Sequence, residues 1–304
     1  GTAGRCFVGR DHASGSVARR QPRRGAAAVA LAVVALTTSS CGSDQISQWK
    51  RLGLPPSASD RAPEVSTLWI GAWTAAWIVG LVVWGLILYA VVRYRRRSEE
   101  QVPSQNRYNL PIEVLYTVVP FIIIAVMFFY TVQKQDAVLA DARPQHTVLV
   151  VGQKWAWSFS YLDEPSLGGE TDVYETGSID EPSTLWLPVD EIVRFELRSP
   201  DVIHSFWVPE FLFKLDVIPG RANSFTLTPT REGTFRGHCA EFCGVSHSRM
   251  YFTLKVVSRQ AFEAHLAQLE DKGQVGALTG DLDPVAVQTT GPGAGEATPP
   301  GAQQ

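Results

Sequence analysis

Residues 238–250 read His-Cys-Ala-Glu-Phe-Cys-Gly-Val-Ser-His-Ser-Arg-Met, and this stretch is the most informative part of the chain. It brings the thiols of Cys239 and Cys243, the imidazole of His247 and the thioether of Met250 into one short loop. Ligands of these types select copper over magnesium or calcium. Their spacing matches neither the C-x-x-C pair of a zinc ribbon nor the C-x-x-C-H motif of covalently attached haem. The stretch therefore predicts a site for a soft metal.

A second histidine, His204, lies 35 positions before Cys239. Two cysteines, two histidines and one methionine suffice to hold a pair of copper ions if both sulfurs bridge the metals. A disulfide between Cys239 and Cys243 is the alternative in an exported protein. Because His247 and Met250 follow at ligand spacing, we favour the metal site.

The first 40 residues have the pattern of a signal peptide: a basic segment at 19–24, a short apolar run at 25–36 and small residues before Cys41. The apolar run is too short to span a bilayer, which takes about 20 residues. Cys41 stands where a bacterial lipoprotein carries its acylated cysteine, although Thr38 replaces the usual leucine of such motifs. Ordinary cleavage and an uncleaved anchor are the alternatives. Cys6 precedes the predicted cleavage site and has no expected role in the mature chain.

Residues 68–92 and 110–132 are the two apolar segments of the chain and predict two transmembrane helices. The loop between them, 93–109, contains five arginines, and an excess of basic residues marks a cytoplasmic loop. The preceding segment, 41–67, and everything after about residue 133 would then lie on the extracytoplasmic side.

Residues 144–258 alternate between apolar and polar side chains in short runs separated by Pro, Gly and Asp, which predicts a sandwich or barrel of antiparallel strands. The expected runs are residues 146–161, 183–188, 192–197, 204–208, 224–228, 233–236 and 250–257. Residues 259–271 are predicted to form a short amphipathic helix, and 273–304, rich in Gly, Pro, Ala, Thr and Gln, a disordered tail. A net charge of −3 argues against nucleic-acid binding.

Three strings resemble subunit II of haem–copper cytochrome c oxidase. They are Asp-Val-Ile-His-Ser at 201–205, Lys-Leu-Asp-Val-Ile-Pro-Gly-Arg at 214–221 and the loop at 239–250. The resemblance covers residues 65–270. It implies a two-helix transmembrane hairpin followed by an all-β, cupredoxin-like Greek-key barrel with a dinuclear copper A site.

The resemblance also assigns the ligands. Cys239 and Cys243 would bridge two copper ions, and His204 and His247 would each bind one of them. Met250 and the backbone carbonyl of Glu241 would be the weak ligands, while the Glu241 side chain would reach a magnesium ion shared with subunit I. No haem motif occurs in the chain, so oxygen chemistry would belong to subunit I.

Further residues take roles from the same resemblance. Trp155, in Trp155-Ala156-Trp157, would accept the electron from cytochrome c, although Ala156 stands where relatives commonly have an aromatic residue. Core packing of both indoles is the alternative. Glu113, near the start of the second span, would lie at the mouth of a proton path into subunit I, and simple placement at the membrane interface is the alternative. His238 is not expected to be a ligand.

The predicted function is electron transfer in a terminal respiratory oxidase of a bacterial plasma membrane. Electrons would pass from a cytochrome c, whether soluble, anchored or bound within a cytochrome bc complex, to the haems of subunit I. Oxygen would there be reduced to water with proton translocation. A quinol oxidase subunit would lack the copper ligands, nitrous oxide reductase would need many more histidines, and a copper chaperone would need open coordination.

Overall fold

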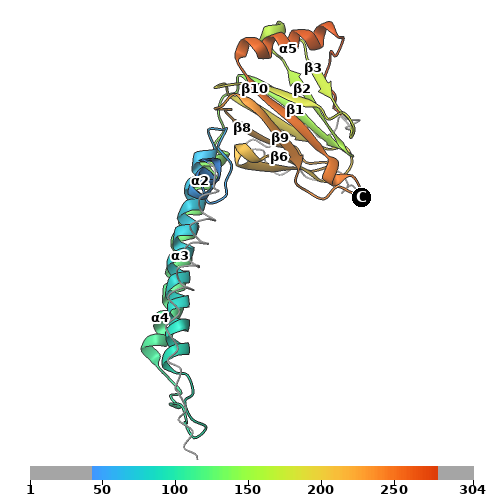
Figure 1. Ribbon diagram of the computed structural model, residues 1–304. Coiled ribbons are helices and arrows are strands. Elements are labelled where there is room, and N and C mark those ends of the chain that lie inside the picture. Colours follow the sequence, from blue (N-terminus) through green and yellow to red (C-terminus); the bar gives the residue numbers. More distant parts are fainter. Residues whose placement is uncertain (1–42, 280–304) are drawn as a thin grey trace, which may run out of the picture. The chain divides into compact units, whose positions relative to one another are not determined.

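The computed structural model describes residues 43–279, and its elements are labelled in Figure 1. By its contacts the chain divides into two compact units, Gly1–Lys50 and Arg51–Gln304. In the first unit the described residues form helix α2, Ser43–Lys50. The predicted signal peptide and Cys41 lie outside the described residues.

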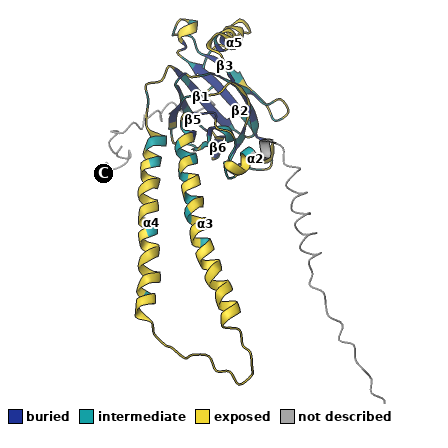
Figure 2. Cartoon of the chain, turned by 60° about the vertical axis from the view of Figure 1, so that its left-hand side comes forward, coloured by how far each residue is buried: buried dark blue, intermediate teal, exposed yellow. Residues whose placement is uncertain are grey.

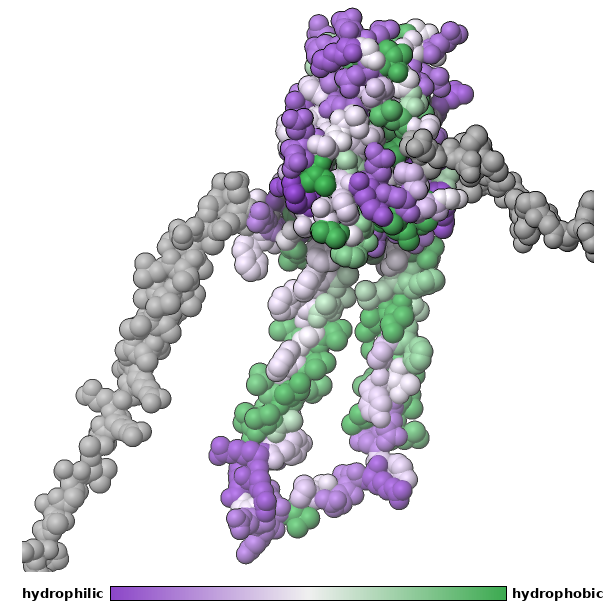
Figure 3. All heavy atoms as spheres, turned by 90° about the vertical axis from the view of Figure 1, so that its right-hand side faces the viewer, coloured by the Kyte–Doolittle hydropathy of each residue, from purple (hydrophilic) through white to green (hydrophobic). Residues whose placement is uncertain are grey.

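Two long helices, α3 (Ala62–Arg93) and α4 (Leu110–Leu139), are long and apolar enough to cross a membrane. Many of their large apolar side chains are exposed, and almost the whole hairpin has the colour of exposed residues in Figure 2. Figure 3 shows these apolar residues gathered on both helices and polar residues on the loop that joins them. A surface of this kind requires lipid or protein around it.

Both helices extend past the apolar segments at the end opposite the joining loop, because polar groups there find partners. Lys134 of α4 pairs with Glu64 of α3 at 2.6 Å. Arg61, immediately before α3, donates hydrogen bonds to the carbonyls of Ala137 and Ala140 at the end of α4. The last carbonyls of a helix have no partner within it, so this arginine supplies one.

The β domain is a sandwich of two five-stranded sheets. The first sheet, in spatial order, is β3 (Val173–Thr176), β2 (Ala156–Leu162), β1 (His146–Gln153), β5 (Val193–Arg198) and β8 (Asn223–Leu227). The second is β4 (Thr184–Pro188), β10 (Tyr251–Val257), β9 (Gly233–Cys239), β6 (His204–Val208) and β7 (Phe213–Val217). The architecture is the expected cupredoxin-like one.

Alternate residues of these strands point inward and build one apolar core. Phe252 lies at its centre, with its ring centroid 5.6 Å from that of Trp157, 5.2 Å from Phe159 and 5.1 Å from Phe206. The neighbouring strand admits the Phe252 ring because Gly237 has no side chain; a Cβ there would lie 2.0 Å from a ring carbon. This aromatic cluster connects both sheets below the predicted metal loop.

The expectation of purely antiparallel pairing is wrong at two places. Strand β1 pairs with β5 in parallel, and β10 pairs with β4 in parallel. Parallel neighbours cannot be joined by a tight hairpin, so the chain leaves each sheet and returns later. Two short strands, β3 and β7, fall outside the predicted runs.

Helix α5, Arg259–Asp271, is capped by the Ser258 side chain and buries Phe262, Leu266 and Leu269 against the domain. The start of the predicted tail is also corrected. Gly276 donates a backbone hydrogen bond to Asp172, and the Leu278 amide donates to Ser160, so residues 273–279 follow the edge of the domain. Residues 280–304 lie outside the described part.

Residues 58–62, which we call the connecting strap, attach the start of α3 to the β domain. The Ala58 amide donates to the carbonyl of Glu210 at 2.8 Å, and the Thr228 amide donates to the Asp60 carboxylate at 2.8 Å. Ala58 and Ala62 are fully buried. The strap belongs to the segment expected on the extracytoplasmic side.

Candidate metal centre

Neighbouring strands bring the predicted ligands together at one end of the second sheet. His204 is the first residue of β6 and Cys239 the last of β9, and these strands pair through Phe206 and Cys239. The Cys239 amide donates to the Met250 carbonyl at 2.9 Å, which closes the loop between β9 and β10. Ligands far apart in the sequence thus meet because two antiparallel ladders end at the same place.

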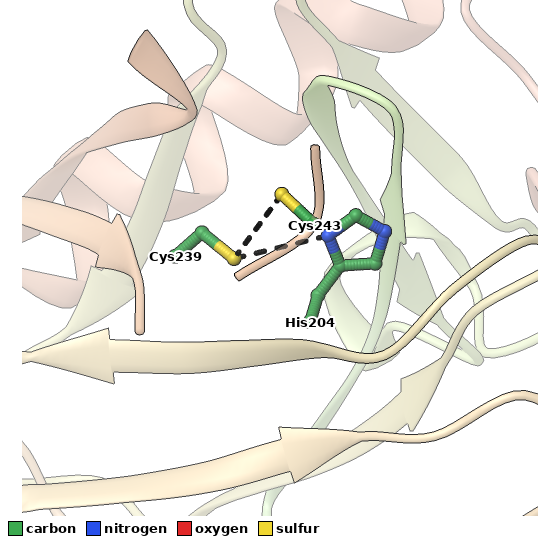
Figure 4. A group of neighbouring side chains, drawn as sticks. All are labelled: His204, Cys239 and Cys243. Atoms are coloured by element: carbon green, nitrogen blue, oxygen red, sulfur yellow. Dashed lines mark hydrogen bonds between the residues drawn. The ribbon is translucent and has the colours of Figure 1, made fainter. Parts of the chain in front are cut away.

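The two thiols lie between the two imidazoles. The Sγ atoms of Cys239 and Cys243 are 3.9 Å apart, and His204 Nδ1 is 3.8 Å from Cys239 Sγ (Figure 4). On the other side, His247 Nδ1 lies 3.6 Å from Cys243 Sγ. His204, Cys239 and Cys243 are buried, and their ligand atoms all lie within 4.8 Å of one another.

The two weaker donors complete this arrangement. Met250 Sδ lies 3.6 Å from Cys243 Sγ, and the Glu241 carbonyl oxygen lies 3.2 Å from Cys239 Sγ. Met250 is almost fully buried. The site is therefore a buried group of histidine, two cysteines and methionine, which is consistent with copper. Both cysteines are free thiols, so the disulfide alternative does not hold in this structure.

His204 is held by its second ring nitrogen. Nε2 is 2.9 Å from the Asp201 carboxylate, which also accepts hydrogen bonds from the amides of Lys154 and Val202. Burial acts to raise the pKa of Asp201, but these hydrogen bonds outweigh it and lower the pKa. A carboxylate in this position fixes the orientation of a ligating imidazole and leaves its other nitrogen facing the metal. The sequence offered one signal for Asp201, its place three residues before His204.

The two thiols differ in acidity. Burial alone would raise the pKa of Cys239, but hydrogen bonds from His204 and the Ser205 amide bring that pKa to about 7. Burial and the nearby Cys239 sulfur raise the pKa of Cys243 to about 12. A negative charge on the Cys239 sulfur disfavours a second negative charge on the nearby Cys243 sulfur. A bound cation relieves this opposition, because metal binding displaces thiol protons.

Trp155 contacts the metal loop directly. Its indole Nε1 donates a hydrogen bond to the Cys243 carbonyl at 3.0 Å. Gly244, with φ +116°, allows the ring this close, since a Cβ there would lie 3.2 Å from the indole. Trp155 precedes β2 and is half-buried, whereas Trp157 lies in the core with a T-shaped contact to the His204 ring at 6.2 Å. The two tryptophans therefore do not share one environment.

The other predicted positions lie outside this cluster. His238 sits on the opposite face of β9 from Cys239, against the Trp207 ring at 5.8 Å. Glu113 is at the start of α4, where its carboxylate accepts a hydrogen bond from the Asn109 amide at 2.9 Å. The Glu241 carboxylate has no hydrogen bond or ion pair with any residue that the structure describes.

Comparison with known proteins agrees with this architecture. Residues 146–257 match the family model for the periplasmic domain of cytochrome c oxidase subunit II, and residues 47–133 match the model for its transmembrane domain. The chain belongs to the cytochrome c oxidase subunit II family. It is thus an electron-transfer subunit of a haem–copper oxidase complex, with two transmembrane helices and a periplasmic domain.

Relatives cover most of the chain. The probable cytochrome c oxidase subunit 2 of Streptomyces avermitilis is 43% identical, over 82% of this chain and 88% of the relative. Cytochrome c oxidase subunit 2 of Mycobacterium bovis is 34% identical, over 89% and 90%. Among solved structures, the periplasmic domain of subunit II from Bradyrhizobium japonicum is 28% identical, with a TM-score of 0.38, covering 43% of this chain and 97% of that one.

Proposed function

We propose that this subunit carries a dinuclear copper A centre that receives electrons from a cytochrome c. Cys239 and Cys243 would bridge the two copper ions, with His204 and His247 as the terminal imidazoles. Met250 and the Glu241 carbonyl would be the weak ligands. The observation that carries this proposal is the sequence of donors, with two adjacent thiols flanked on each side by one imidazole nitrogen and one weak donor.

The donor set passes a simple test of fit. A metal–thiolate bond is about 2.3 Å long, so one ion can contact both sulfurs only if they lie less than twice that length apart. The Cys239 and Cys243 sulfurs are 3.9 Å apart and meet this condition. When bound, the copper pair would supply a one-electron carrier whose charge is shared between the two metals. The weak ligands and the hydrogen bonds around the site would then tune its potential.

Trp155 is proposed as the residue at which electrons enter. Its support is the hydrogen bond from the half-exposed indole to the backbone carbonyl of Cys243, which is itself a proposed thiolate ligand. The donor would be a separate cytochrome c, soluble, anchored or bound within a cytochrome bc complex.

Glu241 is proposed to serve two metals. Its carbonyl oxygen faces Cys239 Sγ, and its carboxylate, without a partner among the described residues, is available to a magnesium ion. Carboxylate oxygens are the hard ligands that magnesium prefers. The remaining magnesium ligands would come from subunit I.

Glu113 is proposed to lie at the mouth of a proton path into subunit I. The positive-inside rule would place it near the cytoplasmic end of its helix, beside the arginine-containing loop. Its hydrogen bond to the Asn109 amide also caps α4, so a purely structural role is the alternative. Electrons would continue to the haems of subunit I, where oxygen is reduced to water with proton translocation across the bacterial plasma membrane.

The test is electron paramagnetic resonance of the full-length subunit, purified within its oxidase complex. We expect the hyperfine pattern of one electron shared by two equivalent copper nuclei. Cys243→Ser should abolish this pattern and stop electron transfer from cytochrome c, because a bridge is lost. His238→Gln is the matched control and should keep both, since His238 lies on the other face of β9. A single-copper spectrum in the unaltered protein would refute the dinuclear site.

A further inference from the structure

A groove lies between α3 and α4, in the half of the hairpin that connects to the β domain. It has a volume of about 340 Å³ and is lined by residues of α3 between Thr67 and Ala75 and of α4 between Val126 and Lys134. Its walls are mostly apolar, and among the described residues that line it Lys134 alone carries a charge. The proposed function makes no use of this groove.

The groove exists because α3 has small residues, Gly71, Ala72 and Ala75, where the lining is shared with α4. Small residues in membrane helices often let two backbones approach each other closely. Gly71 does not serve that purpose, since a Cβ added to it would meet no atom within 4 Å. The space beside Gly71 is therefore open to an occupant other than α4.

The dimensions of the groove suit a lipid chain better than a helix. From Thr67 to Ala75 the lining follows eight residues of helix, which rise about 12 Å. Half of a typical hydrocarbon core is about 15 Å thick, so the groove spans most of one leaflet. One turn of a helix, about 5.4 Å long and at least about 10 Å across with its side chains, occupies more than the 340 Å³ of the groove.

The outer end of the groove has one charge of each sign. Lys134 Nζ lies 2.6 Å from Glu64 Oε2, and the two side chains are 29% and 36% exposed. This pair flanks the apolar segments 68–92 and 110–132, so it lies at the level of the lipid head groups. Tyr130, one turn before Lys134, is an exposed aromatic residue of the kind that is enriched at this boundary.

We infer that this groove binds one phospholipid whose head group has both a phosphate and a primary ammonium, as in phosphatidylethanolamine. One acyl chain fills the apolar interior beside Gly71. The phosphate accepts hydrogen bonds from Lys134, and the lipid ammonium donates to the Glu64 carboxylate, so each charge meets its opposite. An anionic lipid would bring its charge close to Glu64 without an ammonium to compensate, and like charges at a contact are unfavourable.

The head group, and not the acyl chain, provides the selectivity. A chain that enters the groove from the bilayer leaves surroundings as apolar as the groove itself, so it gains little beyond van der Waals contacts. A charged contact near a membrane surface changes the affinity by about fivefold. A quaternary ammonium, as in phosphatidylcholine, has no N–H to donate to Glu64. The groove should therefore prefer phosphatidylethanolamine to both phosphatidylglycerol and phosphatidylcholine.

The experiment uses the oxidase complex with the full-length chain, in phosphatidylcholine nanodiscs. A small fraction of the lipid is phosphatidylethanolamine with a photoreactive diazirine halfway along one acyl chain. After illumination, peptide mass spectrometry locates the labelled residues, and we expect label within 67–75 and 126–134. Unlabelled phosphatidylethanolamine should compete for this labelling, and phosphatidylglycerol should compete at least about fivefold less well.

Gly71→Leu fills the groove and should lower the labelling of both segments by about fivefold or more. Gly85→Leu is the matched control, because Gly85 also has open space beside it but does not line the groove. It should leave the labelling unchanged. Combining Glu64→Gln with Lys134→Gln keeps the groove and removes both charges, so it should abolish the preference for phosphatidylethanolamine over phosphatidylglycerol. The copper hyperfine pattern should be the same in all three variants.

Absence of label from both segments in the unaltered complex would overturn the inference, and would mean that a neighbouring subunit fills the groove. Equal competition by the three lipids would also overturn it, since the groove would then be ordinary lipid-facing surface. Labelling that persisted in Gly71→Leu would place the lipid outside the groove. If Gly71→Leu does not assemble, the loss or persistence of the head-group preference in the charge variant decides the case.

Discussion

Two buried histidines of the β domain are each the first residue of a strand, but their ring nitrogens have different partners. His204 opens β6 and uses one ring nitrogen, with Nε2 on Asp201 and Nδ1 facing a thiol. His146 opens β1 and uses both, with Nδ1 2.9 Å from Glu164 and Nε2 2.8 Å from Glu191. A ligating histidine needs one nitrogen oriented by a partner and the other one available. His146 has none available, and it serves to join segments of the fold.

The two sites also differ in what their charges require. Around His146, Glu164 is fully buried, and Glu191 in turn binds Arg259 of α5 at 2.5 Å. Buried carboxylates without partners are costly, and His146 is the only side-chain partner that the Glu164 carboxylate has among the described residues. Around His204, the unmet requirement is that of two adjacent thiols for a cation. The partners at the first site come from the chain itself, whereas the second site would need the proposed metal.

His204→Leu should have the largest effect on function. Removing one imidazole takes a terminal ligand from one metal, so we expect loss of the shared-electron hyperfine pattern in electron paramagnetic resonance and loss of cytochrome c oxidation. Asp201 keeps its hydrogen bonds from the amides of Lys154 and Val202. The unfolding free energy should therefore fall by less than it does in the corresponding His146 variant. An intact dinuclear signal in His204→Leu would remove His204 from the ligand set.

His146→Leu should have the reverse effect. It leaves Glu164 buried without its hydrogen-bond partner, and breaking a buried ion pair from one side costs about 3–5 kcal/mol. We expect the unfolding free energy in denaturant, followed by tryptophan fluorescence, to fall by about that amount. The copper signal of the folded protein should stay unchanged, because the network around His146 contains none of the proposed ligands. A normal stability combined with a lost copper signal would show that the two sites are not independent.

These contrasts explain what the sequence alone could predict. The metal loop was predictable because four soft or borderline ligand side chains, two thiols, an imidazole and a thioether, occur within a dozen residues. The membrane spans were predictable because each is one long apolar run. The His146 network was not, since its carboxylates lie 18 and 45 residues away and only the fold brings them together. The sequence showed the same residue type at 146 and at 204, and the neighbours in space decide between ligand and structural residue.

The fold shows the same division between local and distant signals. The runs that became β2 and β10 alternate between apolar and polar residues, and the run that became β1 contains the apolar stretch 148–151, so all three were predicted. Strand β3 has neither alternation nor an apolar stretch, so it did not stand out, whereas β7 alternates over its five residues and was nevertheless missed. The parallel pairs β1–β5 and β4–β10 depend on connections that leave and re-enter a sheet. Likewise, Trp155 and Trp157 look alike in sequence, and only the start of β2 at Ala156 separates the half-buried ring from the core one.

The smallest predicted effect is a pH dependence of stability that belongs to His146. Burial acts to lower the pKa of His146, but the hydrogen bonds and charges of Glu164 and Glu191 outweigh burial and raise that pKa above 6.5. A pKa raised by folding means that the folded state binds the proton more tightly than the unfolded state. The stabilisation is therefore complete below about pH 6.5, the usual pKa of histidine in an unfolded chain, and disappears as the pH rises through the higher folded value.

We accordingly expect the unfolding free energy to decrease as the pH rises above about 6.5, by no more than about 1.4 kcal/mol per pH unit for one proton. Denaturant unfolding at several pH values, compared between the unaltered protein and His146→Leu, isolates the contribution of His146 and its two carboxylate partners, because groups that His146 does not contact cancel. Copper should be bound throughout, so that His204 stays a ligand and does not titrate. A difference between the two proteins that grew with pH would have the wrong sign for a charged imidazole between two carboxylates, and would mean that His146 is held neutral in the fold.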